Sequence, residues 1–214
     1  MEVQVDTSDV RFFVKALVLN AKRFMDKSVD AYNKLLQLSP EDAQVIRSSV
    51  GETLEKKGDF DGALNSYKKI LASNPNNVDA LFKIGKIYTN MGLLSEAKEV
   101  LKKTVVLDRQ IAEAFYLLGS AHFATDENTE ALEAFTKAVE LNPGYADAYY
   151  KIGLVCDARA EYDQAIEAYK KALSFKPNMV KVFQSIGLAY ESKGMRDEAV
   201  KWLKKSIETS EKTA

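Results

Sequence analysis

Residues 165–199 read AIEAYKKALSFKPNMVKVFQSIGLAYESKGMRDEA, and the alanines at the two ends of this stretch lie 34 residues apart. The same spacing runs through most of the chain in two columns of small residues. A glycine column is followed, twelve residues later, by an alanine column: Gly51, Gly85, Gly119, Gly153 and Gly187, then Ala63, Ala97, Ala131, Ala165 and Ala199. A fixed period of this length predicts that one structural unit is repeated along the chain.

Large apolar residues recur at helical spacings around the two small columns. Phe183 comes four residues before Gly187, and Leu203 follows four residues after Ala199. Spacings of three and four residues place side chains on one face of a helix, so each unit should contain two helices. A small residue at a helix crossing lets the two backbones approach closely. We therefore expect an all-α fold in which the small columns lie at the contact between paired helices.

Polar residues mark the expected start of the second helix in each unit. Two residues before each alanine stands a side chain that can accept hydrogen bonds from the free amides of a helix start. We interpret these residues as N-caps: Asp61, Ser95, Thr129, Asp163 and Asp197. Prolines should then separate this helix from the next one, at Pro75, Pro143 and Pro177.

This period, with its glycine, alanine, aromatic and proline positions, resembles the tetratricopeptide repeat (TPR), a helix–turn–helix unit. The resemblance implies a TPR superhelical solenoid of antiparallel helix pairs with five full repeats: 44–77, 78–111, 112–145, 146–179 and 180–213. In front of them, the segment SVDAYNKLLQLSP (residues 28–40) echoes the second helix of the later repeats. We expect residues 9–43 to form a degenerate N-terminal TPR-like helix pair.

One joint between repeats departs from the pattern. Arg109 stands where the other internal joints have proline, so the second repeat is expected to pass into the third through a softer or more continuous connection. The sequence leaves open whether this makes a hinge near Asp108–Gln110.

Composition and charge exclude several classes of function. Thirty basic and 31 acidic side chains give a formal net charge of −1, with no dense Lys/Arg cluster to follow a phosphate backbone, so no nucleic acid is expected as a ligand. No apolar run approaches the roughly 20 residues of a transmembrane helix, so any membrane association should be peripheral. The N-terminus shows no signal-peptide pattern, and the lone Cys156 fits a reducing compartment such as the cytoplasm.

No catalytic or cofactor-binding pattern is present. His122 is the single histidine, and it shares with Cys156 a column that faces the partner helix of the same unit, so both are expected to pack in the core. Two such ligands do not complete a zinc site, and isolated glycines form no phosphate-binding loop. We therefore predict that the protein is not an enzyme and has no catalytic residue, no metal and no cofactor.

Stacked TPR units curve, and their first helices line the concave side, which is the expected binding surface. We predict that this groove binds other proteins or peptides through aromatic rings, carboxylates and one lysine: Asp79, Phe82, Lys86, Glu113, Tyr116, Asp147, Tyr150 and Asp157. Rings beside carboxylates suit a peptide that is partly apolar and partly basic. The alternative is that Phe82, Tyr116 and Tyr150 only pack between neighbouring units.

The last repeat is expected to leave an apolar face uncovered, because solenoids normally close with an atypical capping helix and none follows the fifth repeat. Trp202 either shields this face or contacts a second copy of the chain. An exposed apolar end usually signals a contact, so self-association is a direct expectation.

A closer resemblance narrows the expected function. The degenerate leading pair, the five uncapped repeats and the stretch 165–199 are similar to the magnetosome-associated TPR proteins of magnetotactic bacteria. The resemblance implies a cytoplasmic homo-oligomeric scaffold, peripheral on the magnetosome membrane, that serves biomineralization. It also implies that the leading region docks on a neighbouring molecule, with Phe12, Phe13, Phe24 and Tyr32 as candidate contacts. The alternatives are a monomeric adaptor for a single partner and a regulatory fragment of a larger enzyme.

Overall fold

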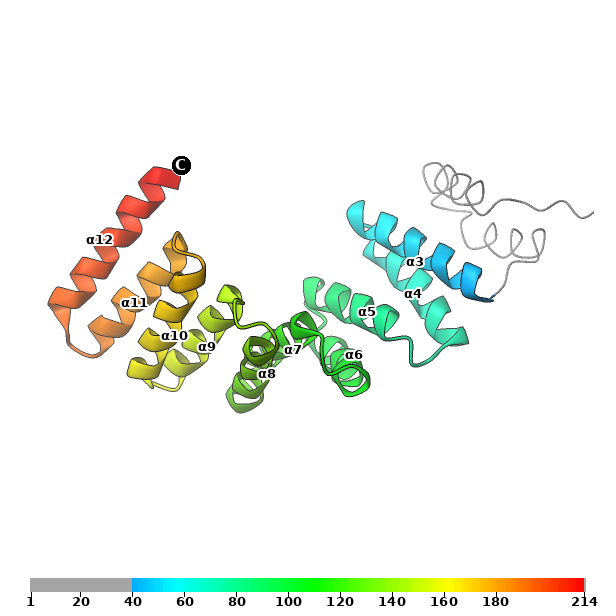
Figure 1. Ribbon diagram of the computed structural model, residues 1–214, viewed down its shortest axis with the longest axis horizontal. Coiled ribbons are helices and arrows are strands. Elements are labelled where there is room, and N and C mark those ends of the chain that lie inside the picture. Colours follow the sequence, from blue (N-terminus) through cyan, green and yellow to red (C-terminus); the bar gives the residue numbers. More distant parts are fainter. Residues whose placement is uncertain (1–39, 214) are drawn as a thin grey trace, which may run out of the picture. The chain divides into compact units, whose positions relative to one another are not determined.

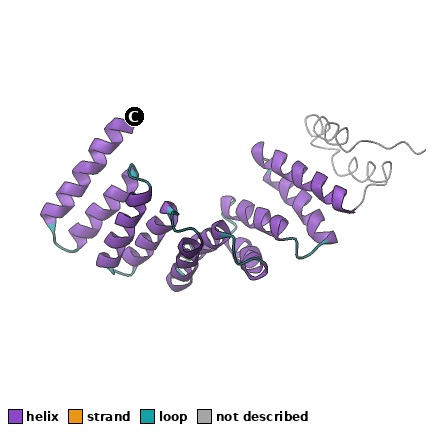
Figure 2. Cartoon of the chain, viewed as in Figure 1, coloured by secondary structure: helices purple, strands orange, loops and turns teal. Residues whose placement is uncertain are grey.

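The computed structural model describes residues 40–213 as helices joined by short loops, with no strand in that range (Figure 2). The chain divides into two compact units, one ending at Ile87 and one beginning at Tyr88. We call them the N-terminal unit and the C-terminal unit and describe each by itself. The predicted all-α class and helical solenoid architecture are confirmed.

Short loops connect consecutive helices (Figure 1). In chain order they are α3 (Pro40–Lys56), α4 (Phe60–Ser73), α5 (Val78–Asn90), α6 (Leu94–Leu107), α7 (Ala112–Phe123), α8 (Asn128–Leu141), α9 (Ala146–Ala158), α10 (Tyr162–Phe175), α11 (Val180–Ser192) and α12 (Arg196–Thr213). In the N-terminal unit α3 packs against α4. In the C-terminal unit the pairs α7–α8, α9–α10 and α11–α12 run antiparallel, and each pair also packs against the next (Figure 1).

In the pairs α3–α4, α7–α8, α9–α10 and α11–α12, a large side chain lies directly on a glycine of the partner helix. A Cβ at Gly51 would lie 2.6 Å from the Tyr67 ring, and one at Gly119 would lie 2.9 Å from the Phe135 ring. The alanine column is buried next to these contacts, with Ala131 fully inaccessible. The predicted role of the small columns, which is to let paired helices approach closely, is confirmed.

The predicted N-caps are wrong by two residues. Asp61, Ser95, Thr129, Asp163 and Asp197 lie in the first turns of helices that begin at Phe60, Leu94, Asn128, Tyr162 and Arg196. At the true N-cap positions, Asp59 accepts a hydrogen bond from the amide of Gly62, whereas Leu93, Glu127 and Glu161 make no side-chain cap.

The backbone of the preceding turn, rather than a side chain, sets where each second helix starts. Ala160 has a φ of 58°, and the amide of Glu161 donates to the carbonyl of Cys156 at 2.9 Å. This hydrogen bond is that of a Schellman-type C-cap, and it reverses the chain before Asp163 is reached. Positive φ values recur one repeat apart at Gly58, Gly92, Asp126 and Gly194. The acids that were predicted to cap remain favourable, because carboxylates in a first turn interact with the helix dipole.

The joint at Arg109 has the same form as the joints with proline. Helix α6 ends at Leu107 and α7 begins at Ala112, so the predicted more continuous connection is wrong. The reason is local: Asp108 Oδ1 accepts a hydrogen bond from the amide of Gln110 at 2.8 Å, which holds the turn without proline. A hinge near Asp108–Gln110 stays a prediction.

The last helix pair leaves apolar side chains uncovered within the described residues. Val200 is 51% exposed, whereas Ile166, its counterpart one repeat earlier, is 5% exposed. Leu188 and Ile207 are exposed on the same pair, and we call these three residues the end face. Trp202 is only partly buried and packs on the core of α10 and α11, 6.1 Å from the Phe183 ring. The leading contacts predicted at Phe12, Phe13, Phe24 and Tyr32 lie outside the described residues.

Candidate protein-binding site

The first helices of three successive pairs bring the central groove residues together in the C-terminal unit. Helix α9 packs against both α7 and α11. We define the first-helix face as Tyr116 on α7, Asp147, Tyr150 and Lys151 on α9, and Lys181 on α11. On α9 the three residues stand at spacings of three and four, so they share one side of the helix.

The two tyrosines of this face pack on neighbouring rings and remain partly accessible. The Tyr116 ring lies 5.8 Å from Phe135 and 4.9 Å from Tyr145, which begins the next pair. The Tyr150 ring lies 5.7 Å from Tyr169. Burial raises the pKa of Tyr116, and the nearby Asp147 carboxylate adds to this shift. The two rings therefore pack between helices, as one alternative predicted, and still expose apolar area that a ligand could contact, as the other predicted.

Asp147, predicted to attract a basic ligand, already has two basic partners. Its Oδ2 lies 2.5 Å from Lys176 Nζ, and its Oδ1 lies 3.9 Å from Lys181 Nζ. Lys181 occupies the position of Asp147 one repeat later. Because equivalent positions of successive repeats lie side by side, opposite charges at these two positions were the sequence signal for the pair. Glu113, one repeat earlier in that column, is exposed.

Asp157, also predicted for the groove, holds its own helix pair together. The Tyr169 hydroxyl donates to Asp157 Oδ2 at 2.6 Å, while Oδ1 is buried without a hydrogen-bond partner among the described residues. Burial raises the pKa of Asp157, and the hydrogen bond from Tyr169 opposes that shift. The N-terminal unit repeats the arrangement, with the Tyr67 hydroxyl donating to Glu55 at 2.5 Å. A tyrosine twelve residues after an acid was the sequence signal for both pairs.

Lys151 is the least compensated charge of the first-helix face. It is partly buried, and its ammonium lies 5.8 Å from the centroid of the Phe123 ring. Burial lowers the pKa of Lys151, and repulsion from Lys181 lowers it further. Lys181 in turn lies 4.6 Å from the centroid of the Tyr150 ring, a cation–π distance.

In the N-terminal unit, Asp79 borders a surface hollow of about 350 Å³. The hollow is lined by residues of α3, α4 and the start of α5: Gln44, Val45, Ser48, Ser49, Glu52, Ile70, Asn77 and Asp79. Its Glu52 pairs with Lys83 at 3.1 Å. Phe82 and Lys86 of α5 are partly buried. The charged residues that line this hollow, Glu52 and Asp79, are both acidic, in contrast to the first-helix face with its lysines.

A polar cluster that sequence reasoning missed surrounds His122. The ring is buried, as expected for a packing residue, and Nδ1 contacts a carboxylate oxygen of Glu127. Lys98 reaches the same carboxylate at 2.7 Å and Thr125 at 3.1 Å. Hydrogen bonds from Lys98 and then from His122 lower the pKa of Glu127 to about 2. The cluster ties α6 to the α7–α8 turn.

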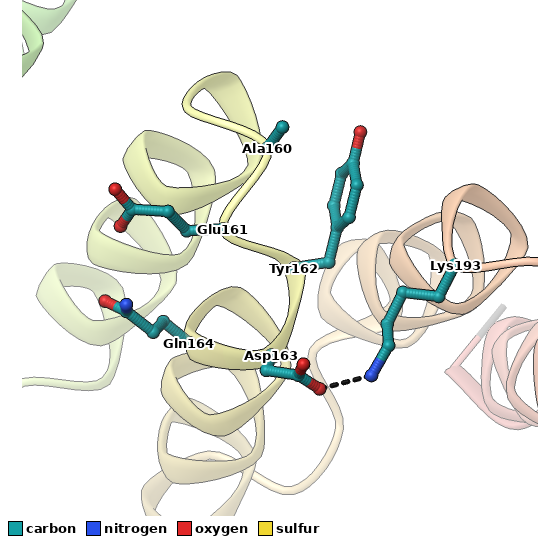
Figure 3. A pocket seen from close by; sticks show the side chains of 6 residues that line it. All are labelled: Ala160, Glu161, Tyr162, Asp163, Gln164 and Lys193. Atoms are coloured by element: carbon teal, nitrogen blue, oxygen red, sulfur yellow. Dashed lines mark hydrogen bonds and ion pairs between the residues drawn. The ribbon is translucent and has the colours of Figure 1, made fainter.

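The described residues offer no cluster of side chains suited to metal binding. No group of three His, Cys, Asp or Glu side chains in residues 40–213 could hold a metal ion, and Cys156 is buried. A hollow of about 250 Å³ beside the α9–α10 turn contains the ion pair of Lys193 and Asp163 (Figure 3), and Glu161 in its lining pairs with Arg159 at 2.9 Å. Within the same range, none of the helices combines the length and apolar character needed to cross a bilayer.

Comparison with known proteins places this geometry in a family. Residues 20–191 match the family model of the tetratricopeptide repeat protein 21 C-terminal ARM domain, and residues 180–213 match a tetratricopeptide repeat. Among curated proteins, BBSome complex member BBS4 of Bos taurus is 32% identical over 83 residues, which are 39% of this chain and 16% of that protein. TPR repeat-containing protein MJ1428 of Methanocaldococcus jannaschii is 25% identical over 111 residues, or 48% of this chain and 18% of that protein. The chain thus spans less than a fifth of these curated relatives.

Solved structures give a closer and more complete likeness. One crystal structure of MamA is 56% identical, with a TM-score of 0.74, and the match covers 76% of this chain and 95% of that chain. A second is 54% identical, with a TM-score of 0.75 and coverage of 79% and 92%. The paired helices, the small-residue contacts and this identity agree, so the chain belongs to the MamA family of tetratricopeptide-repeat proteins.

Proposed function

We propose that the chain is a non-enzymatic scaffold that assembles with further copies of itself and recruits partner proteins, as a peripheral coat on the cytoplasmic side of the magnetosome membrane. The observation that carries this proposal is the 56% identity to MamA over nearly the whole of that solved chain. A tetratricopeptide-repeat fold is a protein-interaction scaffold, and it presents rigid helix faces rather than a catalytic cavity.

The end face supports self-assembly. Leu188, Val200 and Ile207 present apolar area on the last helix pair, and exposed apolar patches commonly mark protein contacts. We propose that a second copy covers this face and that its leading region supplies the contact through Phe12, Phe13, Phe24 and Tyr32. The ring of Trp202, which already packs on Phe183, would form the inner border of the contact.

Light scattering after size exclusion tests the self-assembly. The whole chain should elute as a homo-oligomer, and a chain lacking residues 1–39 should elute as a smaller species. Val200→Glu and Ile207→Glu together should also reduce the oligomer, because they place charge on the end face. The control is Val106→Glu, which changes an even more exposed valine on α6. Identical masses for all four proteins at the monomer value would contradict the scaffold.

Cell fractionation tests the location. After gentle lysis of a magnetotactic cell that expresses the chain, it should co-sediment with magnetosomes and be released by alkaline carbonate, as peripheral proteins are. Recovery of the chain in the supernatant alone would contradict the coat.

A monomeric adaptor that binds a peptide of a single partner is the second candidate. The partly accessible rings of Tyr116 and Tyr150 favour it, since aromatic side chains are typical anchors of binding sites. A monomer that captures one partner from a native lysate at one-to-one stoichiometry would support the adaptor over the scaffold.

A further inference from the structure

The charge balance of the first-helix face differs from the one expected from sequence. Three lysines, Lys151, Lys176 and Lys181, lie around the carboxylate of Asp147, and the one further carboxylate named for this region, Glu113, is exposed. Asp147 engages two of them, and Lys151 makes no ion pair within residues 40–213. The face therefore carries surplus positive charge where acidic residues had suggested negative charge.

Partial burial makes this surplus a binding feature rather than a solvated surface. A buried ammonium loses part of its hydration, and without a counter-ion that loss is not compensated. Lys151 also lies close enough to Lys181 for the two cations to disfavour each other. An anion between them would replace lost hydration for one and relieve repulsion for both.

The rings beside the lysines define the rest of the ligand. Tyr150 lies under the Lys181 ammonium, and the Tyr116 ring, one repeat earlier, lies tilted against the Tyr145 ring. Such rings give rigid apolar contact area at little cost in side-chain entropy. A ligand that matches this face needs an anionic group with apolar side chains next to it.

We propose that Lys151 and Lys181 bind a carboxylate of an acidic peptide segment whose neighbouring apolar side chains contact Tyr116 and Tyr150. The inference rests on the proposed role of the face in protein binding and names the class of its ligand. It reverses the basic peptide that the sequence favoured. An acidic peptide fits better than an anionic membrane, because the cation without a carboxylate partner is partly buried and a flat lipid surface reaches exposed lysines more readily.

A peptide selection tests the ligand class and does not require the partner protein itself. The whole chain is presented to a library of random ten-residue peptides, and the bound sequences are compared with the input. The wild-type chain should enrich Asp and Glu together with apolar residues. The variant Lys151→Met/Lys181→Met should lose the acidic enrichment. The control Lys102→Met/Lys137→Met, which removes two exposed lysines from the second helices α6 and α8, should keep it.

Affinity measurements on one selected peptide show how much the two lysines contribute to binding, and a second variant should change the affinity in the opposite direction. Fluorescence anisotropy should show about tenfold weaker binding to Lys151→Met/Lys181→Met, as expected for loss of charge-assisted hydrogen bonds. Asp147→Asn should bind about two- to fivefold more tightly, because it releases Lys181 from competition. A face that selects basic peptides would respond to Asp147→Asn with weaker binding. Circular dichroism verifies that each variant keeps its helical content.

The outcomes separate this inference from the proposed function. Enrichment of Lys and Arg, or acidic enrichment that survives in Lys151→Met/Lys181→Met, overturns the inference and leaves protein binding intact. No enriched peptide at all overturns both. Lysine-dependent binding to phosphatidylserine vesicles in place of peptides would assign the pair to a membrane and also overturn the inference.

Discussion

The ring of Tyr169 lies against Gly153 with no room for a methyl group between them, because a Cβ at position 153 would overlap Cδ1 and Cε1 of the ring. Both residues belong to the same repeat, on α9 and α10, and the contact fixes the distance between the two helices. Glycine is needed here for space, since its backbone is an ordinary helical one.

Gly153→Ala should therefore destabilise the protein by about 1–3 kcal/mol, the usual cost of overpacking a core. Thermal unfolding followed by circular dichroism measures the loss. The matched control is Gly144→Ala in the loop before α9, where a Cβ would meet its nearest neighbour at 3.6 Å. Equal stability of the two variants would mean that Tyr169 moves aside freely, and the close-approach argument would fail.

Tyr169 also donates a hydrogen bond to Asp157. The loss of stability on removing the Tyr169 hydroxyl should depend on pH. Tyr169→Phe should cost about 1–3 kcal/mol at neutral pH, because it leaves the partly buried carboxylate of Asp157 without its donor. The pKa of Asp157 is already raised by burial, and loss of the donor raises it further. A raised pKa in the folded state means that acid favours folding, so the cost should shrink as the pH falls toward the ordinary aspartate value of 3.8.

Denaturant unfolding across this pH range tests that dependence. Tyr162→Phe is the control, since the Tyr162 hydroxyl points away from the neighbouring side chains drawn in Figure 3 and has no hydrogen bond with another described residue. A cost for Tyr169→Phe that stays constant with pH would show that Asp157 is not the group responsible.

Ala160 adopts a left-handed conformation that glycine occupies in three of the other repeats and Asp126 in the fourth. Its φ is 58°, against 75° at Gly58 and 75° at Gly194. An L-residue with a Cβ pays about 1–2 kcal/mol there, which exceeds the extra chain entropy that glycine loses on folding. Ala160→Gly should stabilise the protein by about 0.5–1 kcal/mol in a urea titration. The same exchange at Ala158, the last residue of α9, which has no positive φ, should have the opposite sign. A loss of stability at both positions would refute the strain.

The 34-residue repeat in the sequence made the helix pairs predictable. The glycine and alanine columns identify the helix pairs, because a small residue opposite a large one is needed wherever two helices touch. Helix starts could not be placed to the residue, since the Glu161 amide finds the Cys156 carbonyl through backbone geometry that side-chain identity does not reveal. The acid at Asp163 was favourable near the start and was therefore mistaken for the start itself.

The charge of the candidate site was harder to predict for a different reason. The ion pairs that decide it join residues far apart in the sequence. Lys176 pairs with Asp147 across 29 positions, and Lys181 reaches the same carboxylate from the next repeat. The columns compare equivalent positions of the repeats, so they leave out residues at helix ends, such as Lys176, that contact the face from another helix. Burial of Lys151 is likewise a property of the assembled face.

The partly buried charge of Lys151 leads to a last prediction, on stability rather than on binding. Lys151→Met keeps most of the aliphatic stem and removes an ammonium that makes no ion pair within the described residues, although the nearby Asp147 carboxylate attracts it. The variant should be more stable than the wild type by about 1 kcal/mol at neutral pH. The folded-state pKa lies below 10.5, so the wild type sheds the penalty as the pH rises through that folded value. The advantage of the variant should therefore decline toward pH 10.5.

Thermal unfolding at a series of pH values measures this difference, with Lys102→Met as the exposed control that should change little. An acidic peptide bound to the face should stabilise the wild type more than Lys151→Met, because the variant keeps only one of the two lysines, Lys181, that are proposed to bind the carboxylate. Lower stability of Lys151→Met at neutral pH would show that the ammonium already has an anionic partner in the folded chain. In that case Lys151 would be a structural residue, and the surplus charge on the first-helix face would not exist.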